Sequence, residues 1–372
     1  GGIISKYDIH GYYVYRLFIN SDGTISFNGG YDGVWTTTLT SLSSVNDDNW
    51  HNISAVFDSQ NMYIFIDGQL DNSVSETRAS KYTNAWHDFC IGTDRYDCVS
   101  VTSGGNDYFA GLIDQVKIYD YARTPAQIAW DYNRGAPVGH WRFDECQGTT
   151  AYDVSGNDNH GTINIGASTP QTSAGTCTSG NSAHAWYNGQ EGRINSAMNF
   201  DGVDDYSLVN DNTILDIEND KLTVGAWVYR KGNGASTAGY ILSKSDNAAT
   251  NHQYGLYYQN TGAFCYMIMN SANACFSNSS IVDNQWHHVA MTYDRSSSQI
   301  KLFINGQLKD TGTVNNDIVG TSSNVYIGCR GNSPPSTNHH FNGLIDDVRI
   351  YNYALTDDQI KTLYNDGVAV RF

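Results

Sequence analysis

The chain has 372 residues, a length that suits two domains, and its hydrophobic share of 40% is enough for packed cores and excludes a disordered chain. Acidic residues outnumber basic ones 38 to 21, and the net charge of −17 repels phosphate backbones, so no nucleic acid is expected as a partner. No apolar run is long enough to cross a bilayer, which argues against direct membrane insertion. The abundant glycine and the low charge, 36 residues and 16%, are typical of an all-β chain with many turns.

The N-terminus leaves two readings open. The chain begins Gly-Gly-Ile-Ile-Ser-Lys, without a methionine and without a visible signal peptide. Either processing has removed an export signal, or the sequence starts partway into a longer protein.

An internal repeat organises the chain. Trp50 and Trp286 open two closely similar segments that lie 236 residues apart. Four pairs of segments match in the same order: 3–6 with 241–244, 50–58 with 286–294, 63–70 with 301–308, and 111–119 with 343–351. The chain therefore consists of two copies of one module.

Each matched segment has the pattern of a strand or a turn. Residues 50–58 alternate in apolar character, as a half-buried strand does. An Asp-Gly pair at 67–68 and an Asn-Gly pair at 305–306 separate apolar runs. Such pairs favour two-residue hairpin turns because both positions need a positive φ. Segments 112–119 and 344–351 are predicted to be further strands.

A short helix is predicted to end each copy. Thr124 and Gln127 have the spacing of a capping box, in which the two side chains satisfy backbone groups of the first turn. Thr356 and Gln359 repeat this spacing. Glycine is a natural helix end, and one follows each segment, at Gly135 and Gly367.

The two copies differ in length. Before residue 241, the second copy has about 100 residues that have no counterpart in the first. They include a loop at 153–160 and the apolar-rich stretches 141–144, 198–202 and 222–228, which are predicted to be strands. A sandwich without such strands exposes its core and unpaired strand edges, which favours pairing with another chain. The simpler alternative is that the sequence begins inside the first domain.

The seven cysteines are interpreted as a disulfide framework, because they show no CxxC or zinc-binding spacing. This favours an oxidised, extracellular protein. Cys329 is left over, either as a buried thiol or as a partner of something outside the chain. Three local pairs are predicted: Cys90 with Cys98, Cys146 with Cys177, and Cys265 with Cys275.

Six motifs follow one another in the second copy: GHWRFDE, AYDVSGNDNHGTI, MNFDGVDDYSLV, WHHVAMTYD, KLFINGQL and FNGLIDDVRIYNYAL. Together they resemble the laminin-G-like jelly roll of the concanavalin A-like lectin/glucanase superfamily. The first copy resembles only the C-terminal half of that module, through WHNISAVFD, YIFIDGQL and FAGLIDQVKIYDYA. The fold predicted from this resemblance is all-β, with tandem antiparallel sandwiches, incomplete at 1–135 and complete at 136–372.

The resemblance implies two antiparallel sheets packed face to face and a place outside the cell or on its surface. Such modules bind carbohydrates or proteins, act in adhesion, and often hold a structural Ca²⁺. Fold alone does not decide among these functions.

The loop at 153–160 is the main candidate for a Ca²⁺ site, because Ca²⁺ takes six to eight oxygen ligands and the loop is rich in Asp and Asn. The resemblance implies that such a loop meets the aspartate of the GLID strand. The predicted ligands are Asp153, Asn157, the carbonyl of His160, and Asp346. The alternative is an Asx-rich turn that satisfies its own backbone.

Two other acidic positions are weighed in the same way. The first copy keeps Asp114 but lacks the loop, so it has no metal site unless another chain supplies one. Asp201, Asp204 and Asp205 are interpreted as an acidic turn between strands.

The tryptophans form two groups. Four occur in strand motifs and are predicted to lie in the core: Trp50, Trp141, Trp227 and Trp286. Sugar sites often use exposed aromatic faces, and three tryptophans that do not recur are candidates for such a role, with ordinary packing as the alternative: Trp35, Trp86 and Trp186.

The sequence favours binding over catalysis. Glucanases on this fold carry a Glu-x-Asp-x-x-Glu pattern on one strand, and retaining glycosidases need two carboxyls about 5 Å apart. The sequence has no such cluster, so no enzyme is predicted. The preferred function is a Ca²⁺-stabilised extracellular binding or adhesion protein for glycans or surface proteins. The alternative is a structural subunit of an extracellular filament or surface assembly, in which the first domain self-associates by accepting strands from another chain.

Overall fold

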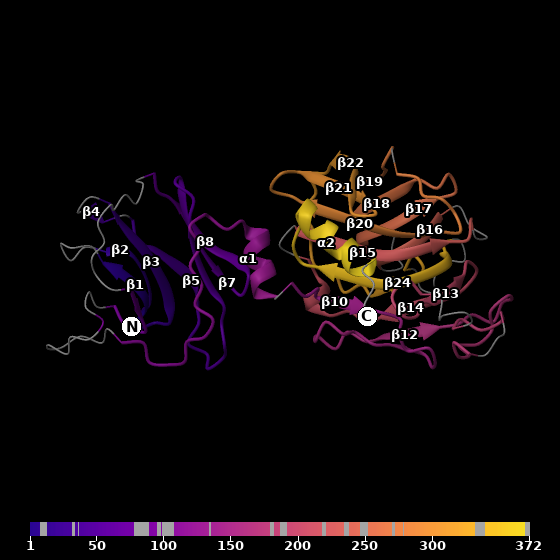
Figure 1. The fold of residues 1–372 in the computed structure, drawn as a ribbon, viewed down its shortest axis with the longest axis horizontal. Coiled ribbons are helices and arrows are strands. Elements are labelled where there is room, and N and C mark those ends of the chain that lie inside the picture. Colours follow the sequence, from indigo (N-terminus) through magenta and orange to yellow (C-terminus); the bar gives the residue numbers. More distant parts are fainter. Residues whose placement is uncertain are drawn as a thin grey trace. The chain divides into compact units, whose positions relative to one another are not determined.

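A computed structural model describes residues 1–7, 13–31, 34–35, 37–77, 89–94, 98, 108–133, 135–178, 182–186, 192–217, 221–233, 238–245, 252–269, 272–277, 279–331 and 339–368. The chain divides into two compact units, residues 1–135 and 136–372. Both units consist mainly of antiparallel strands, which confirms the all-β prediction (Figure 1).

The first unit contains two sheets. The larger sheet has the order β4-β3-β2-β1-β9, with β5 also paired to β3, and the smaller sheet has the order β6-β7-β8. A small core joins the two sheets through buried side chains such as Leu17 of β2 and Ile64 of β7. The strands are β1 (Gly2–Tyr7), β2 (Tyr13–Ile19), β3 (Thr24–Tyr31), β4 (Val34–Trp35), β5 (Leu39–Ser44), β6 (Ile53–Phe57), β7 (Asn61–Ile66), β8 (Gln69–Ser75) and β9 (Phe89–Ile91).

The turns and helix caps that the sequence predicts are confirmed. Asp67 and Gly68 have φ values of 50° and 77°, which is the geometry of a two-residue hairpin between β7 and β8. Helix α1 (Pro125–Tyr132) begins at Thr124 with a complete capping box. Helix α2 (Asp357–Val368) has the same reciprocal bonds at its start, and it continues one residue beyond the predicted end at Gly367.

The second unit is a two-layer sandwich. One sheet has the order β10-β24-β15-β20-β21-β22, with β13 also paired to β24. Its strands are β10 (Gly139–Trp141), β13 (Met198–Asp201), β15 (Lys221–Arg230), β20 (Trp286–Asp294), β21 (Gln299–Ile304), β22 (Gln307–Thr313) and β24 (Asn342–Tyr351). The other sheet has the order β11-β12-β14-β23-β16-β17-β18-β19. Its strands are β11 (Thr150–Ala151), β12 (Gly161–Asn164), β14 (Tyr206–Val209), β16 (Ala238–Ser245), β17 (His252–Gln259), β18 (Phe264–Ile268), β19 (Ala272–Cys275) and β23 (Val325–Ile327).

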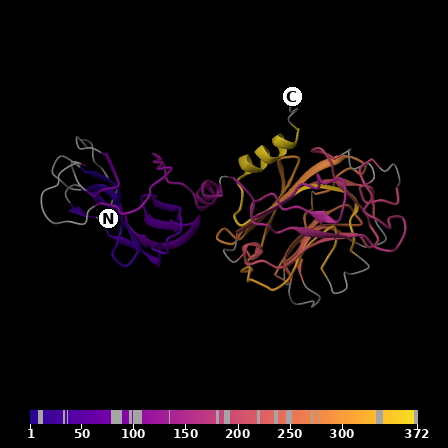
Figure 2. The ribbon, with the colours of Figure 1, turned by 90° about the horizontal axis from the view of Figure 1, so that it is seen from below.

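The core of the second unit lies between these sheets. Alternate residues of β15, such as Val224 and Val228, face alternate residues of β17, such as Tyr254 and Leu256, in one buried cluster. Each fully buried side chain of this size contributes about 1.5–3 kcal/mol relative to an exposed one. Helix α2 lies outside the seven-stranded sheet (Figure 2). There Tyr364 stacks on Trp227 with ring centroids 5.5 Å apart.

The strand predicted at 112–119 is wrong. In the second unit, the matching strand β24 pairs with β10, β13 and β15 and is almost wholly buried. In the first unit the same motif forms no strand, and Leu112 and Ile118 are 77% and 55% exposed. The described residues of this unit contain no counterpart of β15, so the motif has no neighbour with which to form backbone hydrogen bonds.

The prediction that Trp50 lies in the core is wrong for the same reason. Trp50 is 65% exposed. Its counterpart Trp286 packs edge-on against Tyr229 of β15, with ring centroids 5.7 Å apart. The absence of a β15 counterpart in the described part of the first unit leaves Trp50 without this contact. Trp141 and Trp227 are buried, as predicted, whereas Trp286 is only partly buried, so the core prediction is wrong for it as well.

All three predicted disulfides are present, and Cys329 is a buried free thiol whose pKa is raised by burial. The bonds join Cys90 to Cys98, Cys146 to Cys177, and Cys265 to Cys275.

Candidate functional site

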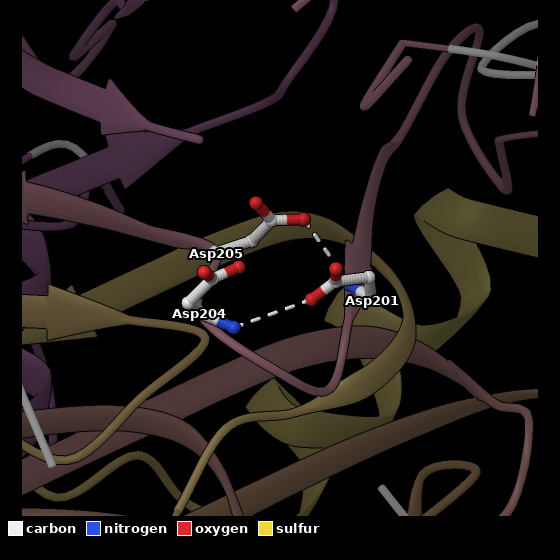
Figure 3. A group of neighbouring side chains, drawn as sticks. All are labelled: Asp201, Asp204 and Asp205. Atoms are coloured by element: carbon white, nitrogen blue, oxygen red, sulfur yellow. Dashed lines mark hydrogen bonds between the residues drawn. The ribbon is translucent and has the colours of Figure 1, made fainter. Parts of the chain in front are cut away.

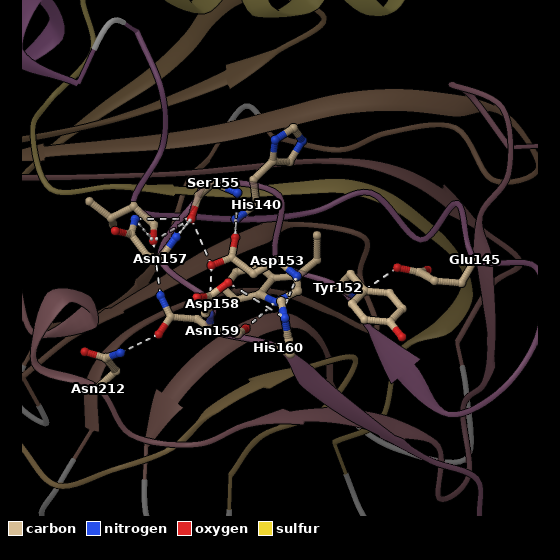
Figure 4. A network of polar contacts seen from close by, with 12 residues as sticks. His140, Glu145, Tyr152, Asp153, Ser155, Asn157, Asp158, Asn159, His160 and Asn212 are labelled. Carbon is tan, nitrogen blue, oxygen red and sulfur yellow. Dashed lines mark hydrogen bonds and ion pairs between the residues drawn. The ribbon is translucent and has the colours of Figure 1, made fainter.

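The loop predicted to bind calcium connects β11 to β12 and is held by its own hydrogen bonds (Figure 4). One carboxylate oxygen of Asp153 accepts the backbone N–H groups of His140 and Ser155, each at 2.9 Å. The other oxygen accepts the Ser155 hydroxyl at 2.8 Å and the backbone N–H of Asn159 at 3.0 Å. A carboxylate offers about four lone-pair sites, and protein donors fill all four.

The other loop residues serve the same internal network. Asn157 donates its side-chain amide to the carbonyl of Val138 at 3.1 Å. The backbone N–H of Asp153 donates to Nδ1 of His160 at 3.1 Å. This geometry favours the alternative reading, an Asx-rich turn that satisfies its own backbone. A Ca²⁺ ion bound here stays a prediction.

Asp346 accepts its hydrogen bond from a residue outside the 153–160 loop. It is fully buried on β24, and one carboxylate oxygen accepts the backbone N–H of Ile194 at 2.7 Å. The other oxygen is buried without a partner among the described residues. Burial, with the charges of Asp347 and Asp144 adding to it, raises the pKa of Asp346 to about 8, so the group is mostly protonated at neutral pH.

The acidic turn brings together the carboxylates of Asp201, at the end of β13, and of Asp204 and Asp205, in the connection to β14 (Figure 3). One oxygen from each carboxylate lies within 4.8 Å of the others. One oxygen of Asp201 and one of Asp204 are buried without a hydrogen-bond partner among the described residues. Oxygen ligands from aspartates at this spacing are those that Ca²⁺ prefers.

The remaining contacts fix the acidic turn in place. Asp205 is fully buried, and its two oxygens accept the backbone N–H groups of Gly166 at 3.1 Å and Asp201 at 3.3 Å. Burial, with the charges of Asp201 and Asp204 adding to it, raises the pKa of Asp205 to about 7. The sequence does contain this group of aspartates, but spacing alone does not reveal which of their oxygens lack a partner.

Of the three tryptophans proposed for sugar stacking, the structure describes the side chain of one, Trp186. Trp186 is fully buried and donates its indole N–H to the carbonyl of Gly148 at 3.0 Å, so it offers no exposed face and the prediction is wrong. Trp35 belongs to β4, but its side chain lies outside the described residues, and so does the whole of Trp86.

A pocket of about 420 Å³, here called the tyrosine pocket, lies on the outer face of the eight-stranded sheet. Along β17, alternate residues such as Leu256 and Tyr258 face the core, while Tyr257 belongs to a separate buried cluster on the other face with Tyr240 of β16. Tyr240 and Tyr257 are register partners, and their rings stack 4.4 Å apart at 8°. The pocket is lined by Ala238, Tyr240, Tyr257, Gln259, Asn260, Thr261, Arg330 and His339.

The polar groups of the tyrosine pocket come from strand ends and loops. Gln259 ends β17, Asn260 and Thr261 follow it in the turn, and all three are exposed. Arg330 follows β23, and His339 precedes β24. These convergent polar groups could exchange hydrogen bonds with a small polar ligand.

Sequence reasoning missed the tyrosine pocket because its residues come from four separate segments. Only one signal hints at it, the tyrosine-rich run at 254–258, whose period-2 pattern places Tyr257 opposite the core-facing residues. The partners at positions 240, 330 and 339 become neighbours only when β16, β17 and β23 pair.

A family comparison identifies the fold from the sequence. The model of the concanavalin A-like lectin/glucanases superfamily matches residues 3–129 and 201–361, one segment in each unit. The chain belongs to this superfamily. The match confirms the predicted family.

Solved structures with a similar fold are distant. The binding domain of botulinum neurotoxin serotype D has 16% identity and a TM-score of 0.43, over 63% of this chain and 51% of its own length. A domain of an extracellular arabinanase from Geobacillus stearothermophilus, solved with arabinotriose, has 21% identity and a TM-score of 0.42, over 62% and 98%. A pentraxin from Limulus polyphemus has 21% identity and a TM-score of 0.33, over 39% and 70%. The chain thus spans about half of the neurotoxin binding-domain structure.

No curated protein matches the chain. Within the described residues, no helix has the length and apolar character needed to cross a membrane.

Proposed function

We propose that this protein is an extracellular, non-catalytic glycan-binding protein and that the tyrosine pocket of its second unit takes the sugar. The observation that carries the proposal is the pocket itself, in a chain that belongs to a lectin-like superfamily. Tyr240 and Tyr257 are 3% and 5% exposed and form the buried base of the pocket, and amide and hydroxyl groups at 259–261 can exchange hydrogen bonds with sugar hydroxyls.

The composition of the pocket supports binding without catalysis. Hydrolysis of glycosides requires two carboxyl groups flanking the scissile bond. The described residues that line the tyrosine pocket include no aspartate or glutamate. The three disulfides support a place in an oxidising compartment, and therefore outside the cell.

A glycan array followed by calorimetric titration of the best ligand tests this proposal. We expect micromolar to millimolar binding, and we expect Gln259→Ala to weaken it by about tenfold because one direct hydrogen bond is lost. Gln259 is exposed, so its removal leaves the fold intact. The matched control is Gln299→Ala, an exposed glutamine at the start of β21, which should bind like the wild type. Equal losses in both variants, or no binding to any glycan, would count against the proposal.

We further propose that the calcium expected from the sequence binds the acidic turn. The support is the pair of buried carboxylate oxygens at Asp201 and Asp204, which lack protein partners among the described residues, whereas the oxygens of Asp153 are filled. Bound there, the ion would link Asp201 at the end of β13 to Asp204 and Asp205 just before β14, and so stabilise the sandwich.

Thermal unfolding in 2 mM Ca²⁺ and in EDTA checks this site. We expect Ca²⁺ to raise the Tm of the second unit by roughly 5 °C, as for a ligand at many times its Kd. Asp204→Asn should remove the shift. The control Asp158→Asn changes a 92% exposed side chain of the other loop and should keep it. A shift that survives Asp204→Asn but disappears in Asp153→Asn would place the ion in the 153–160 loop instead.

The first unit favours a second function, acceptance of a strand. In the second unit β15 lies between β20 and β24. In the first unit β6, the counterpart of β20, pairs only with β7 among the described strands, and the apolar side chains at 112–121 are exposed. We propose that this open face accepts an extended segment with the apolar alternation of β15, as in a surface assembly.

Peptide binding to the intact chain tests strand acceptance. A labelled peptide with the sequence of residues 221–230 should bind, and its fluorescence anisotropy should rise with protein concentration. The control peptide carries proline at the positions of Gly225 and Trp227, because proline cannot donate to a ladder. Indistinguishable curves for the two peptides, or flat curves for both, would rule the second function out.

A further inference from the structure

The charge of the tyrosine pocket is opposite to that of the chain. Acidic residues outnumber basic ones 38 to 21 in the whole sequence. Among the described residues that line the pocket, however, the only charged group is the guanidinium of Arg330. His339 lies edge-on to Tyr240, and burial together with the charges of Arg330 and His340 lowers its pKa, so it is neutral at pH 7.

Arg330 is paired differently from three other arginines of the second unit. Arg230, Arg295 and Arg349 each form an ion pair with an aspartate. Within the described part of the chain, no carboxylate pairs with Arg330. Its guanidinium instead donates to Nε2 of His252 at 2.6 Å, which requires that nitrogen to be an unprotonated acceptor. The Nε–H of Arg330 is buried without a partner among the described residues.

We propose that the glycan of the tyrosine pocket is acidic and that Arg330 binds its carboxylate, as in a uronic acid or sialic acid residue. This inference rests on the proposed glycan-binding function. A guanidinium presents parallel N–H groups that match the two oxygens of a carboxylate, and such charge-assisted bonds are stronger than neutral ones. A neutral sugar would leave the cation without an anionic partner in a partly desolvated site.

Specificity then has two sources in this pocket. Tyr240 and Tyr257, which are buried and stacked on each other, form the base of the pocket and limit how deeply a sugar enters. Arg330 fixes the end of the ring that bears the acid, and the exposed residues at 259–261 face the hydroxyls. The net negative charge elsewhere on the chain disfavours acidic polymers in general, so the ligand must be an acidic sugar that fits the pocket rather than any polyanion.

Titration with matched sugars tests the proposal on the intact chain. The probes are tri-galacturonic acid against its methyl ester, and 3′-sialyllactose against lactose, so that each pair differs in the acidic group. We expect the preferred acid to bind at least tenfold more tightly than its neutral partner at 50 mM salt, with the preference shrinking as salt rises. Arg330→Gln should abolish the preference but keep the weak neutral binding, and Arg330→Lys should keep part of it. The control Arg295→Gln, which changes an arginine of the turn between β20 and β21, should keep all of it.

The possible outcomes distinguish the acidic-ligand proposal from the glycan-binding function on which it rests. Equal affinity for acid and neutral partner, or a preference that survives Arg330→Gln with an unchanged circular dichroism spectrum, would overturn the acidic ligand and leave glycan binding standing. Binding of no sugar in either pair, together with a blank glycan array, would overturn both.

Discussion

Lys244→Met should lower the free energy of unfolding of the second unit by about 3–5 kcal/mol, because it breaks a buried ion pair from one side. Lys244 lies on β16 with no solvent exposure, and its ammonium contacts a carboxylate oxygen of Asp211 at 2.6 Å, one of Asp216 at 3.2 Å, and the carbonyl of Ser323 at 2.6 Å. Asp216 is only 12% exposed, so the variant leaves a largely desolvated carboxylate without its cation.

Urea unfolding at pH 7 measures this loss. Lys301→Met is the matched control, because Lys301 forms an ion pair with Asp357 at 3.0 Å in which both side chains are 30% exposed or more. Exposed pairs contribute less than about 1 kcal/mol. A loss in Lys244→Met as small as that of the control would mean that the buried network does not have the described geometry.

Asp346→Asn should stabilise the second unit at pH 8, which is unusual for a change in a buried strand. Burial and two neighbouring carboxylates raise the pKa of Asp346 to about 8, so folding at that pH requires the carboxyl to take up a proton or to hold a buried charge. With about 1.4 kcal/mol per pKa unit and an unfolded value near 4, the gain has an upper limit of about 5 kcal/mol. The new amide lacks an acceptor, so the measured gain should be smaller.

The direction of the pKa shift of Asp346 determines how the stability difference between Asp346→Asn and the wild type changes with pH. A raised pKa means that the carboxyl favours the folded state below pH 4 and that this stability is lost as pH rises to 8. The free-energy difference between variant and wild type should therefore be near zero at pH 4 and grow up to pH 8. Asp347→Asn is the control of opposite sign: although burial opposes it, hydrogen bonding to His140 and the charge of Arg349 hold the pKa of Asp347 below its usual value. That variant should destabilise the protein at pH 7, and parallel profiles for the two variants would contradict the account.

The elements that sequence predicts well are those defined by local chemistry. The Asp67-Gly68 turn, the capping box at Thr124 and the three disulfides depend on residues that are close along the chain, and all are present. Long strands such as β15 and β24 are also clear, because their apolar residues follow a strand period. The internal repeat supports these predictions, because the same pattern is found in both copies of the module.

The failures concern features that depend on distant partners. The motif at 111–119 matches β24 closely and yet forms no strand, because a strand exists only where a neighbour accepts its hydrogen bonds. Trp50 is exposed because the described part of the first unit has no counterpart of β15, the strand whose Tyr229 contacts Trp286. Calcium binding at the 153–160 loop stays a prediction, and composition does not show that three backbone N–H groups and the Ser155 hydroxyl already fill the oxygens of Asp153. The tyrosine pocket is assembled from strands and loops that no local pattern connects.

A crystal structure of the chain with its best-binding glycan tests the central claim most directly. We expect the sugar to lie in the tyrosine pocket on the outer face of the eight-stranded sheet, with an acidic group at the guanidinium of Arg330 and a hydroxyl at Gln259. A glycan bound in the first unit, or elsewhere on the second with the tyrosine pocket empty, would contradict it.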